Sequence, residues 1–317
     1  MNIDPSALWR LSPAPAPLWG LVGGGLAAIS LATAVARWHP RLRGQPRVAQ
    51  AVQSWVPVIL AVALLVLLGP GVTWLGCAAV SVALLREGLR LVPLTGAQRR
   101  LHGGLAAVLA VAANALLALG SAPWAFGLCV VYVGLLLAPL HMLAAGPANF
   151  MARVGGLTLV LNACVTLCLF VGLLVLRPSA GRPFGGPGQA CFFFVVVIFS
   201  DAMQYVGGKR WGRARLAPAI SPGKTWAGVL FSTAVCALLG LALGPWLLAL
   251  PAWAGAALGA AMVWVGLVGD LLISCWKRDA GVKDTGSALP GQGGVLDRCD
   301  SLLFLAPWFW GVMQVSA

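Results

Sequence analysis

The chain has 317 residues, of which 60% are hydrophobic and only 9% are charged. Soluble domains carry about 25% charged residues, so this composition excludes an ordinary soluble protein. It predicts an all-α fold, a polytopic bundle of about 8–10 transmembrane helices. The formal net charge of +13 then indicates basic loops beside anionic lipid headgroups, and no nucleic-acid partner is expected. The eight Cys residues include no C-x-x-C pair, so neither a disulfide framework nor a zinc site is expected.

Ten apolar segments follow an irregular, Pro-rich segment at residues 1–17. Most approach the about 20 residues that a helix needs to cross a bilayer. Three of them are short, so eight or nine spans remain alternatives. We expect a transmembrane scaffold over residues 18–189 and a transmembrane catalytic region over residues 190–317. The segments are Leu18–Ala36, Trp55–Leu68, Gly71–Leu85, Gly104–Gly120, Trp124–Leu143, Gly155–Leu176, Ala190–Val206, Thr225–Ala249, Trp253–Leu272 and Leu302–Val315.

The distribution of Lys and Arg predicts which loops share a side of the membrane. With the N-terminus outside, 18 of the 21 basic residues fall in inside loops and 3 fall outside. Such a bias is typical of cytoplasmic loops. We therefore expect an integral protein of the inner, cytoplasmic membrane. The loops at 207–224 and 274–300 should both face the cytoplasm, where nucleoside triphosphates are found.

The charged side chains are concentrated in one stretch, residues 269–301, between apolar segments. Carboxylates that hold a divalent cation, together with basic groups that hold phosphates, would explain so dense a mixture of charges. Only Asp4 and Glu87 are acidic before residue 200, so the chemistry is expected in the C-terminal third. The first 150 residues are expected to form a lipid-facing scaffold or a dimer surface. The charged residues of the stretch are Asp270, Lys277, Arg278, Asp279, Lys283, Asp284, Asp297, Arg298 and Asp300.

Asp297 and Asp300 are three positions apart, which on a helix places their Cβ atoms about 5–6 Å apart on one face. Carboxylates that close repel each other unless a cation lies between them or one is protonated. Two interpretations remain open for the pair, a metal site and a cap on the last helix. Asp270 and Asp201 lie near the ends of apolar segments, where they face either a polar cavity or the headgroups.

Residues 221–225, Ser-Pro-Gly-Lys-Thr, look like the end of a P-loop. The first Gly of that motif would fall at Pro218, no strand is expected before it, and an apolar span follows it, so a Walker fold is rejected. Lys224 remains a candidate phosphate contact, as do Lys209, Lys277, Arg278, Lys283 and Arg298. For some of these residues, plain topological charge is the alternative.

Residues 274–301 resemble the signature of the phosphatidate cytidylyltransferase family, also called CDP-diacylglycerol synthases. The resemblance extends over roughly residues 195–305, through a segment that begins at Ser200 and a Ser-Pro-x-Lys-Thr box at 221–225. Three positions depart from the family pattern: Gln292 replaces His, Gly223 replaces Lys and Ala227 replaces Glu. The matching residues are Ser200, Asp201, Gln204, Tyr205, Gly207, Lys209, Gly212, Ser221, Pro222, Lys224, Thr225, Trp226, Gly228, Ser274, Lys277, Arg278, Lys283, Asp284, Gly286, Leu289, Pro290, Gly291, Gly293, Gly294, Asp297, Arg298, Asp300 and Ser301.

The resemblance implies a reaction between CTP and phosphatidic acid, or a related anionic lipid, that yields CDP-diacylglycerol and pyrophosphate. It implies Mg²⁺ on Asp270, Asp297 and Asp300, with a second cation left open. Lys277 and Arg278 join these three as implied catalytic residues. A homodimer is also expected. The implied substrate contacts are Asp201, Lys209, Ser221, Lys224, Thr225, Lys283, Asp284, Gln292 and Arg298.

Other functions stay open as alternatives. A CTP-dependent lipid kinase would release CDP instead of pyrophosphate. A lipid transporter would move its substrate without consuming CTP, and no inverted repeat is visible in the sequence. A CDP-alcohol phosphatidyltransferase is disfavoured because its Asp-Gly-x-x-Ala-Arg motif is absent. Gln292 and Ala227 keep a divergent or inactive relative among the alternatives.

Overall fold

The computed structural model describes residues 14–38, 55–177, 181–286 and 293–315. Helices dominate the described residues, and six of these helices are long and apolar enough to cross a membrane. Each of the ten predicted spans corresponds to a helical segment, so the all-α bundle is confirmed. The elements are α1 (Ala16–Trp38), α3 (Trp55–Leu67), α4 (Pro70–Gly88), α5 (Gly96–Ala118), α6 (Ala122–Val131), η2 (Tyr132–Leu136), α7 (Leu137–Ala145), α8 (Phe150–Leu161), η3 (Asn162–Leu167), α9 (Cys168–Leu176), α10 (Gly185–Trp211), β1 (Arg215–Ala217), β2 (Ser221–Thr225), α11 (Trp226–Leu248), α12 (Ala252–Asp279) and α13 (Leu296–Val315).

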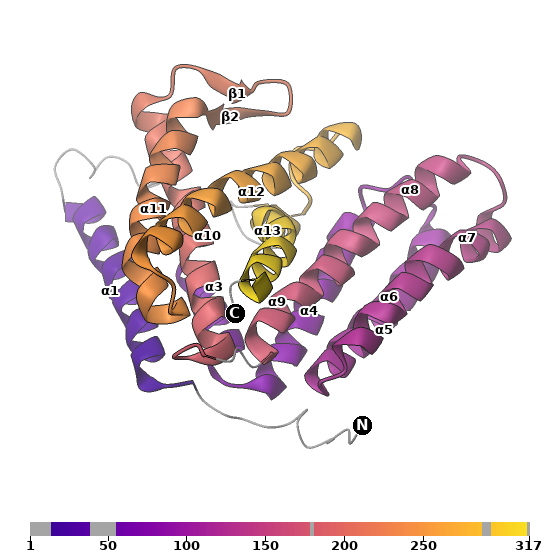
Figure 1. Cartoon of the computed structure of the whole chain (residues 1–317). Helices are drawn as coiled ribbons and strands as arrows, with labels where there is room; N and C mark the ends of the chain where they lie inside the picture. The colour runs from indigo at the N-terminus through magenta and orange to yellow at the C-terminus, as the bar shows by residue number, and fades with distance from the viewer. Residues whose placement is uncertain (1–13, 39–54, 178–180, 287–292, 316–317) are drawn as a thin grey trace.

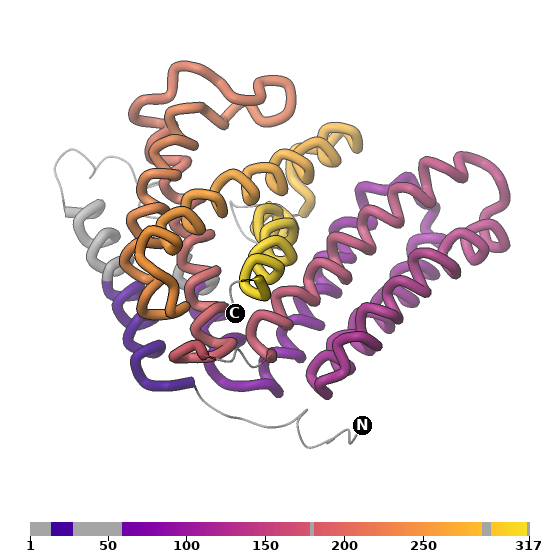
Figure 2. The backbone as a smooth tube through the Cα atoms, in the orientation of Figure 1, coloured from indigo at the N-terminus to yellow at the C-terminus, as the bar shows by residue number. Residues whose placement is uncertain are grey.

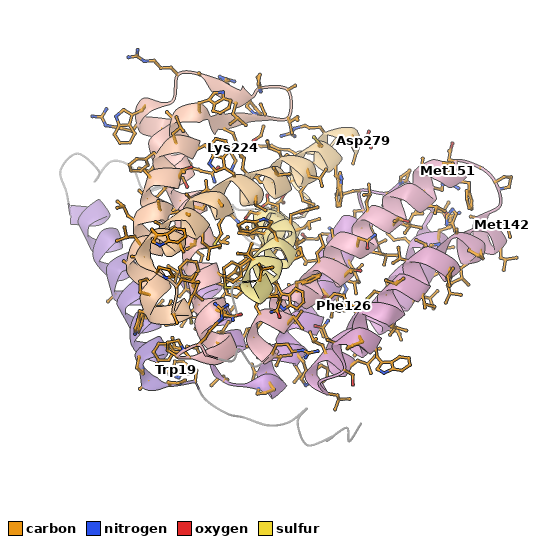
Figure 3. All side chains as sticks on the ribbon, in the orientation of Figure 1. Trp19, Phe126, Met142, Met151, Lys224 and Asp279 are labelled. Carbon is orange, nitrogen blue, oxygen red and sulfur yellow. The ribbon has the colours of Figure 1, made fainter. Side chains whose placement is uncertain are left out.

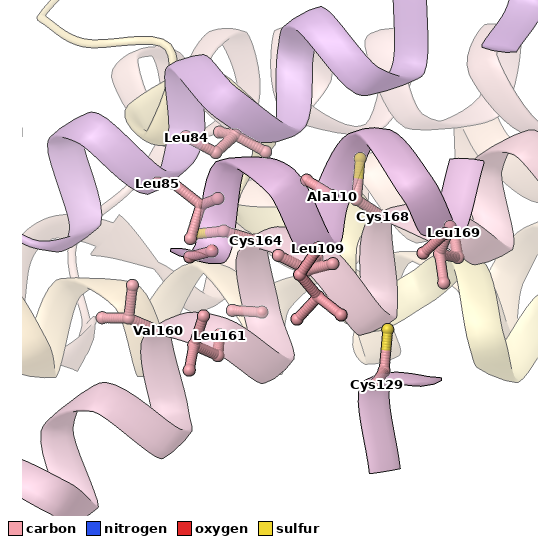
Figure 4. Close-up of a cluster of buried hydrophobic side chains, with 14 of the residues drawn as sticks. Leu84, Leu85, Leu109, Ala110, Cys129, Val160, Leu161, Cys164, Cys168 and Leu169 are labelled. Carbon is pink, nitrogen blue, oxygen red and sulfur yellow. The ribbon is translucent and has the colours of Figure 1, made fainter. Parts of the chain in front are cut away.

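Two apolar cores hold the helices together. The first is built mainly from α4 to α9, and Figure 4 shows side chains such as Leu85, Leu109 and Cys164 meeting in it. The second joins α1, α3 and the end of α9 to α10, α11 and α12. The N-terminal helices α1 and α3 thus pack with the C-terminal third of the chain.

Helix α13 contributes side chains to both cores. Leu296 and Leu303 belong to the first core, whereas Leu305 and Phe309 belong to the second. Figures 1 and 2 show α13, in yellow, between the α10–α12 group and the α4–α9 group. The position of α13 is therefore fixed from two sides.

A short antiparallel hairpin connects α10 to α11, with Arg215 opposite Thr225 and Ala217 opposite Ser221. The sequence predicted a basic loop without strands here, which is wrong for residues 215–217 and 221–225. Pro218 and Pro222 lie within this short segment and hide its pattern. Arg278, near the end of α12, donates from Nε to the carbonyl oxygen of Ile220 at the hairpin tip, 3.2 Å away. The described parts of the 207–224 and 274–300 regions therefore lie beside each other, whereas the membrane face on which they lie stays a prediction.

The aromatic contacts of Phe309 give a test of this packing. Its ring centroid lies 6.1 Å from that of Phe192 and 5.3 Å from that of Phe193, and all three residues are fully buried. We expect Phe309→Ala to lower the free energy of unfolding. The decrease should lie at the low end of about 3–5 kcal/mol, because lipid and detergent also shelter apolar groups. Thermal melting in detergent measures the loss. Trp253→Ala, at a residue 75% exposed, should leave the melting temperature unchanged, and equal losses in the two variants would contradict the packing.

Candidate active site

Lys224 lies where the hairpin meets the helices, and it is labelled in Figure 3. Its Nζ is 2.6 Å from Oδ2 of Asp270 on α12. The same Nζ donates to Oε1 of Gln204 on α10, at 2.8 Å. One ammonium therefore joins three segments that are far apart in the sequence.

Two further carboxylates interact with this pair. Asp300, on α13, is repelled by Asp270 and Asp201 and attracted by Lys224. Ser301 donates its backbone N–H to Oδ1 of Asp300 at 2.8 Å and its hydroxyl to Oδ2 of Asp201 at 3.4 Å. Asp201, Asp270 and Asp300, from α10, α12 and α13, thus form an acidic cluster around Lys224.

A glycine permits the close approach of α12 and α13 at this cluster. A Cβ atom at Gly269 would lie only 2.7 Å from the carbonyl oxygen of Asp300. Real Cβ atoms essentially never come that close, so a side chain at 269 would push the two helices apart. The glycine before Asp270 therefore lets the backbones of α12 and α13 approach where both carry a carboxylate.

The pKa of Lys224 is raised above its ordinary value. Burial works to lower that pKa, but attraction from Asp270 and Asp201 outweighs the burial. The two side chains are each 18% exposed, so the ion pair is only partly buried.

A second charged cluster lies beside the first, at the start of α13. Lys277 Nζ donates to Oδ1 of Asp297 at 2.7 Å. Oδ2 of Asp297 accepts from the backbone N–H groups of Thr285 and Gly294, at 2.8 and 2.9 Å, and from the Thr285 hydroxyl at 3.0 Å. Burial opposes ionisation of Asp297, yet the bond from Lys277 and the backbone bonds bring its pKa below the ordinary value. These donors all lie outside α13, so Asp297 joins the first turn of α13 to the preceding loop and to α12.

Glu87 contacts the same loop from α4, although no role in the site was predicted for it from the sequence. Its Oε1 accepts from the Val295 backbone N–H at 3.0 Å. Its Oε2 accepts from the Leu296 N–H at 2.8 Å and the Thr285 hydroxyl at 3.0 Å. An isolated acid in an apolar half of the chain was the available signal, because such a residue is seldom buried without partners.

The other predicted site residues have separate surroundings. Arg278 binds the carbonyl oxygens of Ile220 and Val282. The Thr225 hydroxyl accepts from the Gly228 N–H at 3.2 Å and so caps α11, and Lys209 lies over the ring of Tyr205. Ser221 begins β2, and Lys283 and Asp284 are exposed. Arg298 attracts Asp201 from the first turn of α13. Gln292 lies outside the described residues.

The metal prediction grouped Asp270, Asp297 and Asp300, but the structure sets Asp201 beside Asp270 and Asp300 and pairs Asp297 with Lys277. Within the described part of the chain, no three His, Cys, Asp or Glu side chains are grouped so as to hold a metal ion as they stand. The donors are nevertheless carboxylate oxygens, the type that Mg²⁺ prefers. Arg298 also attracts Asp201, so a second basic side chain lies near the three carboxyl groups. The cluster thus fits a divalent cation in donor type.

Comparison with known proteins identifies the family. A model of the cytidylyltransferase family matches residues 49–316. The chain belongs to the cytidylyltransferase family. The matched region includes Lys224 and all three carboxylates of the acidic cluster.

Curated relatives match over shorter stretches. A phosphatidate cytidylyltransferase of Synechocystis sp. is 47% identical over 116 residues, 36% of this chain and 39% of that protein. One of Mycobacterium bovis is 36% identical over 174 residues, 54% of each chain. The uncharacterized protein YnbB of Escherichia coli is 34% identical over 176 residues, 56% of this chain and 59% of YnbB. The matches thus span about half of the length of these relatives.

The charge balance around Lys224 can be tested by a double-mutant cycle. Lys224→Met leaves the acidic cluster without its ammonium. Breaking a fully buried ion pair lowers the free energy of unfolding by about 3–5 kcal/mol. We expect a decrease of about 2 kcal/mol here, because the pair is partly exposed. Adding Asp270→Asn should recover at least half of the lost stability, measured by thermal melting in detergent. Losses that simply add would show that the two side chains do not interact.

The pKa of Asp297 predicts a pH dependence. A carboxyl group whose pKa is lowered by folding stabilises the protein above its ordinary pKa of 3.8, and this contribution is lost as the pH falls through the folded-state value. The melting temperature of wild type should therefore exceed that of Asp297→Asn by a constant difference from about pH 5 to 8. This difference should shrink below about pH 4. A margin that shrinks near pH 7 would contradict the lowered pKa.

Proposed function

We propose that this chain is a phosphatidate cytidylyltransferase, which forms CDP-diacylglycerol and pyrophosphate from CTP and phosphatidic acid. The observation that carries the proposal is the meeting of three motif segments around Lys224. Asp201 comes from the segment that begins at Ser200, and Lys224 comes from the box at 221–225. Asp300 belongs to the third segment, residues 274–301, and Asp270 lies just before it. The family membership and the named relatives support the same reaction.

The chemistry requires that two anions meet. An oxygen of the lipid phosphate attacks the α-phosphorus of CTP, a new P–O bond forms, and the bond to the β-phosphate oxygen breaks to release pyrophosphate. The attacking phosphate is already ionised, so no strong general base is needed, and Gln292 in place of His is compatible with activity. Lys224, Lys277 and Arg298 supply positive charge that lowers the repulsion between the substrates and stabilises the leaving pyrophosphate.

We propose that Asp270 and Asp300 hold a Mg²⁺ ion, with Asp201 or Asp297 as the third carboxylate. When bound, the ion would neutralise phosphate charge and polarise the bond that breaks. Lys224 keeps the carboxylates together while no nucleotide is present. Its ammonium can turn from Asp270 toward a phosphate, because a lysine side chain is long and flexible.

We place the site on the cytoplasmic face of an inner membrane. The 18 basic residues on one side, the side of both charged clusters, support this orientation. CTP is made in the cytoplasm, whereas phosphatidic acid reaches the site within the bilayer. The homodimer stays a prediction.

The products distinguish the proposed reaction from a lipid kinase. Purified protein in detergent with phosphatidic acid, magnesium and CTP labelled on the α-phosphate should yield a labelled lipid and unlabelled pyrophosphate. Asp300→Asn should lower the rate by at least about 100-fold, as expected when a group that stabilises transition-state charge is lost. Removal of divalent cations with EDTA should stop the reaction.

Leu230→Ala serves as the matched control, because this side chain is 58% exposed on α11. It should turn over at the wild-type rate. Release of CDP together with a phosphorylated lipid would identify a lipid kinase instead. The absence of labelled lipid together with uncleaved CTP would indicate an inactive relative, and either result overturns the proposal.

A further inference from the structure

We propose that Glu87 is a positioning residue, which fixes the start of α13 and thereby the carboxylates of Asp297 and Asp300. Glu87 lies at the end of α4, in the half of the chain that the family motifs do not reach. It is 6% exposed, and three donors from residues 285–296 converge on its carboxylate. Its effect on turnover rests on the proposed function, whereas its effect on the loop does not.

The contacts of Glu87 require a side chain with two accepting oxygens. Oε1 accepts from Val295 N–H and Oε2 accepts from Leu296 N–H. These amides stand at the beginning of α13, where a helix leaves its N–H groups without partners inside the helix. Glu87 therefore caps α13 from a distant helix. A glutamine cannot replace it, because in either orientation its NH₂ group would face a backbone N–H.

Two glycines make room for the carboxylate. A Cβ atom at Gly286 would lie 2.6 Å from Oε1 of Glu87. A Cβ atom at Gly294 would collide with Oε2 of Glu87 and with the Thr285 hydroxyl. Both glycines are among the residues that carry the family resemblance. Their contacts show that they allow the backbone to close on Glu87.

Thr285 links this cap to the second charged cluster. Its hydroxyl oxygen is 3.0 Å from Oε2 of Glu87 and 3.0 Å from Oδ2 of Asp297. A hydroxyl carries one proton, so it donates to one carboxylate at a time. Asp297 in turn holds Lys277 on α12. A chain of hydrogen bonds thus runs from α4 through Thr285 and Asp297 to α12.

Glu87→Gln tests the proposal with almost no change in volume. We expect amide hydrogen exchange in residues 293–301 to accelerate at least tenfold, while exchange in α10 and α11 stays as in wild type. Turnover should fall at least tenfold in kcat with less than a threefold change in KM for CTP, because the reacting groups lose their alignment and CTP keeps its contacts. Loss of stability alone would change exchange throughout the protein.

Arg86→Gln is the matched control, since Arg86 is the exposed neighbour of Glu87 on α4. It should match wild type in exchange and in turnover. Unchanged exchange at residues 293–301 in Glu87→Gln, or turnover within twofold of wild type, would overturn the proposal. Should wild type itself form no CDP-lipid, the proposed reaction fails and the exchange result alone decides the role of Glu87.

Gly294→Ala provides a second variant in case Glu87→Gln fails to fold. The added methyl group collides with Glu87, so this variant should also accelerate exchange in residues 293–301. A double variant that combines Gly294→Ala with Glu87→Ala removes the carboxylate and should relieve the collision. Its amide exchange in residues 293–301 should be slower than the two single-variant accelerations multiplied together. Effects that multiply without any relief would contradict the contact between Glu87 and Gly294.

Discussion

Opposite charges paired in partly buried surroundings organise the C-terminal half of this protein. Lys224 binds Asp270, and Lys277 binds Asp297, at 2.6 and 2.7 Å. Carboxylates at the edge of a bilayer are costly unless a cation compensates them. Each lysine joins segments that the sequence separates, so charge compensation also determines how the hairpin, α12 and α13 come together. Carboxylate oxygens are the donors that a divalent cation such as Mg²⁺ prefers, whereas the two lysines are groups that bind phosphate.

Helix α13 transmits this arrangement to the whole bundle. Its first turn carries Asp297 and Asp300, and its remaining length packs into both apolar cores. The scaffold helices therefore do more than separate the site from lipid. Through Glu87, α4 contacts the backbone from which the acidic residues of α13 project. Motion between the two groups of helices would alter the spacing of Asp270 and Asp300.

The sequence predicted the helices well because apolar runs of membrane length are a strong signal. It also placed the 207–224 and 274–300 regions on one side, since basic residues mark loops on one face. The hairpin was missed because two short strands leave little periodic pattern. The grouping of Asp297 with Asp270 and Asp300 followed from the family resemblance, and only the Asp297–Asp300 pair followed from helical spacing as well. Spacing could not show that Lys277 and Thr285 engage Asp297, nor that Glu87, about 200 residues earlier, reaches the same loop.

The most direct measurement is a structure of the protein in a lipid nanodisc with a non-hydrolysable CTP analogue and Mg²⁺. The account predicts a nucleotide whose phosphates contact Lys224 and a metal ion bound by Asp270 and Asp300, on the side of the hairpin. A nucleotide bound at the opposite end of the bundle, or phosphates distant from all three of these residues, would contradict it.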